Sequence, residues 1–146
     1  MNRRDFLSLT AAVTLATPLA LAPQRARAAT STMLTYTPGL IEERLRKGEV
    51  VFVDYHATWC GTCAVQDRIM TELQAENPAY LQKITFIRVD WDTWLNDPVT
   101  TSRNIPRRST LLVLKGEAEL GRLVATTAKA KIKELFDTAL AAAATA

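Results

Sequence analysis

Two cysteines in the sequence Cys60-Gly61-Thr62-Cys63 are the residues best suited to chemistry, and the chain has no others. Thiols at this spacing can close a small disulfide and open it again. An apolar run of strand length, residues 50–55, precedes them, and a helical pattern begins at Cys60. Free N–H groups and the helix dipole at a helix N-terminus stabilise a thiolate. Because thiolates attack disulfides, the pair indicates electron exchange with other thiols.

Three other uses of the cysteine pair need weighing. A structural disulfide closing so short a loop would restrict the unfolded chain very little, which disfavours that role. Zinc sites also use two cysteines at this spacing, but no second pair exists to complete a four-sulfur site. Metal binding by Cys60, Cys63 and His56, with copper(I) or a shared iron–sulfur cluster, stays open as an alternative function. A redox-inert interaction module is a third possibility.

The pattern around the cysteines predicts an α/β protein with the element order α-β-α-β-α-β-β-α. Helices are expected at residues 37–48, where Thr37 caps and Pro38 begins the helix, and at 60–77, 97–104 and 132–140. Strands are expected at residues 50–55, 84–89, 110–114 and 120–124. The βαβ part implies a parallel pair and the β-turn-β part an antiparallel pair. The cysteines then lie at the carboxyl end of a central strand, where sites in α/β sheets occur.

The N-terminus has the pattern of an export signal. Arg3-Arg4 precedes the apolar stretch 6–22, and Ala26-Arg27-Ala28 supplies a cleavage site. This predicts a signal over residues 1–28 that uses the twin-arginine route, and a mature domain over residues 33–142 in the periplasm. The alternative is a membrane helix, but several hydroxyl residues and Pro18 make the stretch a poor span. We expect no stable membrane insertion after the signal is removed.

The charge of the chain lies mostly in this segment. Residues 1–28 hold four arginines and one aspartate, so their net charge is +3, the same as that of the whole chain. The rest therefore balances basic against acidic residues, and nothing in it suggests nucleic acid or an anionic membrane as a partner.

The chain resembles the thioredoxin-like family over residues 34–140. The resemblance rests on Asp54, Ala57, Trp59 and the Cys60–Cys63 motif, then on Asp90 and on residues 110–117. Residues 53–60 are most similar to the periplasmic domain of the inner-membrane disulfide-reductase transporter. The resemblance implies the thioredoxin fold, with a central mixed four-stranded sheet flanked by helices on both faces. No cofactor is expected beyond a redox-active Cys60–Cys63 disulfide.

The resemblance also implies a role for each matching residue. Cys60 resembles the nucleophile, and Cys63 the resolving thiol one helical turn inside. Asp54 resembles the buried carboxylate that accepts or relays the proton of that thiol. Burial in an apolar strand disfavours the charged form of a carboxyl, so Asp54 is suited to proton transfer near neutrality, unless it points to solvent. Trp59 resembles the aromatic residue that shields the nucleophile, the alternative being plain core packing.

One position departs from the family, which places a cis-proline before the third strand, facing the cysteines. Using Pro106 there would put Arg107 and Arg108 inside a buried strand, so we expect Ser109 to face the pair. Arg108, Ser109 and Thr110 then join Trp59 as substrate-binding residues. The arginines would favour the thiolate and attract acidic partners, or simply lie in a solvated loop. A Ser109→Pro substitution would be expected to restore ordinary thioredoxin-like substrate binding.

The expected function is that of a periplasmic thiol–disulfide oxidoreductase that reduces or exchanges disulfides in exported proteins. Its partners would be protein disulfides or dithiols. A membrane electron donor would regenerate it, because the periplasm has no redox buffer. The residues Gly61-Thr62 do not settle the direction of electron flow.

Overall fold

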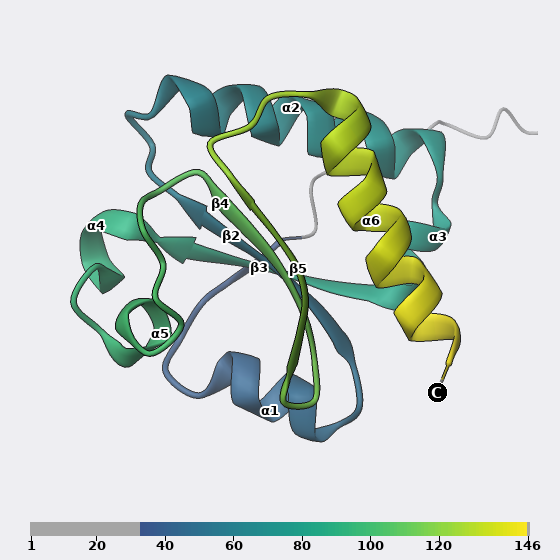
Figure 1. The fold of residues 1–146 in the computed structure, drawn as a ribbon, viewed down its shortest axis with the longest axis horizontal. Coiled ribbons are helices and arrows are strands. Elements are labelled where there is room, and N and C mark those ends of the chain that lie inside the picture. The colour runs from purple at the N-terminus through teal and green to yellow at the C-terminus, as the bar shows by residue number, and fades with distance from the viewer. Residues whose placement is uncertain (1–32, 146) are drawn as a thin grey trace, which may run out of the picture.

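A computed structural model describes residues 33–145, so the predicted export signal at residues 1–28 lies outside the described part. Its centre is a five-stranded mixed sheet with the strand order β1-β3-β2-β4-β5 (Figure 1). The strands are β1 (Leu34–Thr35), β2 (Val50–His56), β3 (Ile84–Asp90), β4 (Thr110–Lys115) and β5 (Ala118–Val124).

Strand β2 occupies the middle of the sheet. It runs parallel to β3 on one side and antiparallel to β4 on the other. All of its residues from Val50 to Tyr55 are buried, as expected for an apolar run with a layer of helices on each face. The short strand β1 pairs with β3, and β5 pairs with β4. The cysteine pair therefore follows the central strand of the sheet, which is paired with a neighbouring strand on each side.

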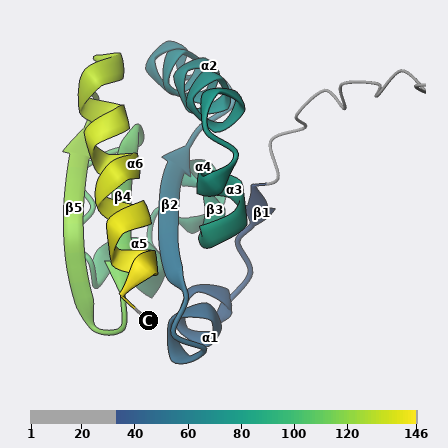
Figure 2. The ribbon, with the colours of Figure 1, turned by 90° about the vertical axis from the view of Figure 1, so that its right-hand side faces the viewer.

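Within residues 33–145, six helices cover the two faces of the sheet, and the sheet separates two hydrophobic cores. The helices are α1 (Leu40–Arg46), α2 (Gly61–Glu76), α3 (Ala79–Lys83), α4 (Trp91–Trp94), α5 (Pro98–Thr101) and α6 (Lys129–Ala144). Phe52 points into the core beneath α2, α3 and α6, whereas its neighbours Val51 and Val53 point into the core beneath α1 and α5. Figure 2 shows α6 and α3 in front of the strands, on the first of these faces.

Aromatic packing fixes α6 against this first face. The Phe136 ring lies 4.9 Å from that of Phe52 and 5.0 Å from that of Tyr80, both at edge-to-face angles. Gly121 of β5 allows the close approach, since a Cβ atom there would lie 2.6 Å from the Leu135 side chain. Helix α2, which begins directly after Cys60, is packed into the same core through Met70 and Leu73.

The predicted mixed sheet with helices on both faces is confirmed, but it has five strands rather than four. Strand β1 has only two residues, too few for a periodic pattern, and it exists because β3 offers a free edge. Helices α3 and α4, of five and four residues, were not predicted either. Helix α1 begins at Leu40 after Gly39, whose φ of +85° needs glycine, and not at Thr37-Pro38. Within residues 33–145, no helix combines the length and apolarity that a membrane span requires.

Candidate active site

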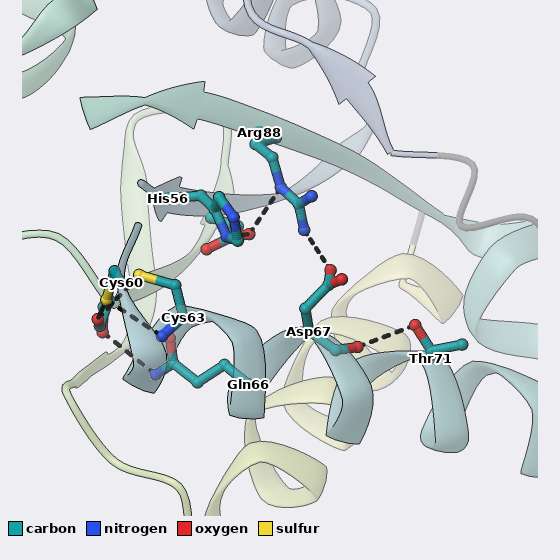
Figure 3. A network of polar contacts seen from close by, with 9 residues as sticks. His56, Cys60, Cys63, Gln66, Asp67, Thr71 and Arg88 are labelled. Carbon is teal, nitrogen blue, oxygen red and sulfur yellow. Dashed lines mark hydrogen bonds and ion pairs between the residues drawn. The ribbon is translucent and has the colours of Figure 1, made fainter. Parts of the chain in front are cut away.

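Cys60 and Cys63 lie at the N-terminus of α2, a few residues after the end of β2. Cys60 is the N-cap residue of α2, and its Sγ atom accepts a hydrogen bond of 3.2 Å from the backbone N–H of Cys63. Both thiols are free and buried, with 5% of Cys60 and none of Cys63 exposed. Figure 3 shows the two sulfurs at the start of α2. Helix α2 thus offers Cys60 as the more accessible thiol and holds Cys63 behind it.

Ser109, directly before β4, lies against both sulfurs. Its Oγ atom is 3.1 Å from Cys60 Sγ and 3.1 Å from Cys63 Sγ. Its φ angle is +63°, in the left-handed region that non-glycine residues rarely adopt. The structure therefore places Ser109 at the cysteines, as the sequence predicted, whereas Pro106 lies on the exposed part of the loop.

The backbone of Ser109 is tied to three neighbouring segments. Its N–H donates to the carbonyl of Tyr55 at 2.7 Å, and its carbonyl accepts from the N–H of Ala125 at 2.8 Å. The side-chain amide of Gln66, on α2, donates to the same carbonyl and also to that of Thr126. Gln66 was not predicted as a site residue. The signal in the sequence that could have identified it is a glutamine on the inner face of an amphipathic helix.

These ties argue against the expectation that proline could replace Ser109. Proline fixes φ near −65° and has no N–H, so it can neither adopt the φ angle of +63° nor donate to Tyr55. The loop would have to rearrange before proline fitted, and a simple return to family-like substrate binding is no longer expected.

The surroundings of the two thiols give them unequal acidity. Burial alone would raise the pKa of Cys60. Hydrogen bonds from the Cys63 thiol and the Ser109 hydroxyl, and then from the Cys63 N–H and Arg108, outweigh it and lower that pKa to about 7. Burial, followed by the neighbouring Cys60 thiol, raises the pKa of Cys63. Cys60 therefore ionises first, as a nucleophile must.

Asp54 is buried behind the cysteines but is not alone. Only 1% of its side chain is exposed, and its Oδ2 atom accepts a hydrogen bond of 3.0 Å from Arg88 Nε on β3. Arg88 also pairs with Asp67 on α2, and His56 Nδ1 lies 3.6 Å from Asp54 Oδ2 (Figure 3). No partner for Asp54 was predicted from the sequence. The structure corrects this with a buried ion pair that joins β2, β3 and α2.

Trp59 and Arg108 form the outer rim of the site. Trp59 is 60% exposed, so it is not a core residue, and its Nε1–H donates to Asp92 at 2.8 Å. The guanidinium carbon of Arg108 lies 4.2 Å from the centre of the Trp59 ring, within the range of a cation–π contact. Thr110 is buried, and its hydroxyl donates to the carbonyl of Arg107, so it shapes the loop and presents no free hydroxyl.

Comparison with known proteins places this geometry in a family. The model of the thioredoxin family, described as "Thioredoxin", matches residues 33–138. The chain belongs to the thioredoxin family. It is 29% identical over 94 residues to a thioredoxin of Mycolicibacterium smegmatis, which covers 64% of this chain and 81% of that protein. A thioredoxin of Alicyclobacillus acidocaldarius is 28% identical over 101 residues, covering 68% and 90%.

Solved structures give the same result for the thioredoxin fold. Trxlp of Edwardsiella tarda superposes with a TM-score of 0.63 at 24% identity, covering 72% of this chain and 98% of that one. Oxidised thioredoxin of Plasmodium falciparum gives a TM-score of 0.59 at 25% identity, covering 73% and 96%. The thioredoxin fold and the Cys60–Cys63 pair together make this chain a thiol–disulfide oxidoreductase. The finer resemblance to the transporter domain stays a prediction.

Among residues 33–145, no three or more histidine, cysteine, aspartate and glutamate side chains are grouped so that they could hold a metal ion.

The unequal acidity of the two thiols leads to a first prediction. Alkylation of Cys60 by iodoacetamide should accelerate as pH rises, with a midpoint near pH 7, because the thiolate is the reactive form and the pKa of Cys60 is about 7. Peptide mass spectrometry would follow each cysteine. In the urea-unfolded chain the midpoint should rise to the ordinary thiol value, near 8.5. A folded-state midpoint equal to the unfolded one would contradict the assigned electrostatics.

Proposed function

We propose that this thioredoxin-family protein reduces or exchanges disulfides in exported proteins after its own export to the periplasm. The observation that carries the chemistry is the asymmetry of the thiols: Cys60 is the more acidic and the more exposed of the two, and Cys63 is fully buried. The twin arginines Arg3-Arg4, the apolar stretch 6–22 and the site at Ala28 support the compartment.

The reaction proceeds in two exchanges. The Cys60 thiolate attacks one sulfur of a substrate disulfide, so a Cys60–substrate bond forms, the substrate S–S bond breaks, and the second substrate sulfur leaves as a thiolate that takes up a proton. Cys63 then loses its proton and attacks Cys60 Sγ, forming the Cys60–Cys63 disulfide and releasing the first substrate sulfur. Two electrons pass from the cysteine pair to the substrate.

Asp54 takes up the proton that Cys63 loses. Its Oδ2 atom is occupied by Arg88, but its Oδ1 atom is buried and has no hydrogen-bond partner within residues 33–145, which leaves a site for a proton. The Arg88 pair holds the carboxyl in place for this step.

The rim of the site supports a preference among substrates. Trp59 offers an exposed apolar surface beside Cys60, and Arg108 places positive charge over its ring. These groups favour disulfides flanked by acidic residues. Regeneration requires a membrane thiol donor that reduces the Cys60–Cys63 disulfide, because the periplasm has no redox buffer of its own.

A trapping experiment on the full-length chain tests this function. Cys63→Ser should accumulate mixed disulfides through Cys60, and the captured proteins should be exported ones, visible on non-reducing gels of periplasmic fractions and identified by mass spectrometry. The Cys60→Ser/Cys63→Ser double variant is the matched control and should capture none. In a parallel culture, replacing Arg3 and Arg4 with lysine should keep the protein in the cytoplasm. Captured partners that are all cytoplasmic, or unchanged location of the lysine variant, would refute the proposal.

A further inference from the structure

The left-handed backbone of Ser109 is the most unusual feature of the site. A φ angle of +63° costs a non-glycine residue energy, and such residues persist where the surrounding structure holds them for a purpose. The bonds to Tyr55, Ala125 and Gln66 supply that support. The result is a fully buried hydroxyl aimed at two sulfurs at equal distances of 3.1 Å.

A single hydroxyl cannot donate a hydrogen bond to both sulfurs at once. It has one hydrogen to donate and two lone pairs that accept. In the reduced protein, the charged sulfur attracts the hydrogen, and the protonated sulfur can donate to the oxygen. The chain S–H···O–H···S⁻ runs from Cys63 through Ser109 to Cys60 and satisfies all three groups. The Ser109 hydroxyl is one of the groups that lower the pKa of Cys60, whereas burial and the Cys60 thiol raise the pKa of Cys63.

We propose that the Ser109 hydroxyl serves the two sulfurs in turn, donating its hydrogen first to Cys60 and then to Cys63 as the reaction advances. The inference rests on the proposed two-step exchange through Cys60 and Cys63. In the first step the hydrogen bond holds the Cys60 thiolate ready to attack.

The second use of the hydroxyl follows from the charge that moves during the exchange. Once Cys60 is bonded to a substrate sulfur it carries no charge, and the hydrogen of Ser109 no longer has a thiolate to meet there. Rotation about the Cβ–Oγ bond alone turns it to Cys63, because the Oγ atom already lies 3.1 Å from both sulfurs. There it stabilises the thiolate that forms when the Cys63 proton leaves. Cys63 Sγ then bonds to Cys60 Sγ, and the bond from Cys60 to the substrate breaks.

The experiment separates the two steps with a small chromogenic disulfide. Mixing the reduced protein with one equivalent of dithiobis(nitrobenzoate) releases one coloured thiolate when Cys60 attacks and a second when Cys63 resolves the mixed disulfide. Ser109→Ala removes the hydroxyl and keeps the Cβ atom. Ser109→Gly also removes it and accepts the positive φ angle freely, which guards against a folding defect in the alanine variant. Ser102→Ala, the same change at the exposed serine that caps the C-terminus of α5, is the matched control.

Both phases should slow in the alanine and glycine variants of Ser109. Neither phase should slow in Ser102→Ala. Loss of a hydrogen bond to a charged sulfur should lower each thiolate fraction about tenfold at pH 6, and the greater nucleophilicity of a more basic thiolate offsets part of this, so each rate should fall about threefold. The alkylation midpoint of Cys60 should rise by about one pH unit. At pH 9, where Cys60 is ionised, the equilibrium with glutathione should shift about tenfold toward the disulfide, a potential lower by about 30 mV.

Each other outcome overturns the inference. Unchanged phases and an unchanged midpoint would show that the hydroxyl has no part in the chemistry. Slowing of the first phase alone would show that the Ser109 hydroxyl does not donate its hydrogen to Cys63 in the second step. Slowing in Ser109→Ala but not in Ser109→Gly would assign the effect to packing. Because the probe is a small disulfide, these results do not depend on export or on the identity of the protein substrates.

Discussion

Replacing Cys60 with serine should lower the rate of insulin-disulfide reduction by at least about a thousandfold, because a serine hydroxyl does not ionise near neutral pH and cannot replace a thiolate nucleophile. No other residue can take over, since Cys63 is fully buried behind Cys60. The measurement is the turbidity of reduced insulin with dithiothreitol as the electron source.

Cys63→Ser provides the comparison for this experiment. It leaves the Cys60 thiol in place, so the first attack should proceed and the reaction should stop at the mixed disulfide. Wild-type insulin reduction by Cys60→Ser would show that the assigned mechanism is wrong. So would stable mixed disulfides formed through Cys63 in that variant.

Removing the charge of Arg88 should have the largest effect on stability. Arg88→Ala leaves the Asp54 carboxylate almost fully buried without its cation, and breaking a buried pair in this way costs about 3 kcal/mol of unfolding free energy. Urea unfolding followed by circular dichroism would measure the change at pH 7. The second contact of Arg88, with the partly exposed Asp67, contributes less.

Two variants separate stability from function. Arg103→Ala breaks an ion pair with Glu42, whose side chain is half exposed, and should cost less than about 1 kcal/mol. The double variant Asp54→Asn/Arg88→Ala removes both charges and should regain much of the stability lost in Arg88→Ala. Its thiol exchange should be slow at pH 7, because the group that accepts the Cys63 proton is gone. Equal stability of Arg88→Ala and wild type would contradict the buried-pair assignment.

The central part of the fold and the position of the thiols could be predicted from the sequence because their signals are local. The apolar run at residues 50–55 can only be a buried strand, and the helical pattern starting at Cys60 follows it directly. Ser109 was placed correctly because two adjacent arginines, Arg107 and Arg108, cannot enter a buried strand. Each of these inferences needs only a few neighbouring residues.

The polar groups around Asp54 could not be predicted, because they depend on how strands align. Asp54 meets Arg88 only through the register of β2 against β3, in which the two residues lie opposite each other. A one-residue shift would have turned Arg88 to the opposite face. The contact of Gln66 with Ser109 likewise joins residues far apart in the chain, and no local pattern specifies it.

The internal bonding of Ser109 bears on how selective this protein is. A backbone N–H or carbonyl left free beside an active site can bind any extended polypeptide, because every polypeptide offers the same main-chain groups. At Ser109 both groups already have partners within the protein, at Tyr55 and Ala125. Binding must then depend more on side chains such as Trp59 and Arg108, whose fit varies from one partner to the next. The protein should accordingly be a specialist with a narrow set of client disulfides, unlike an oxidoreductase that accepts almost any unfolded chain.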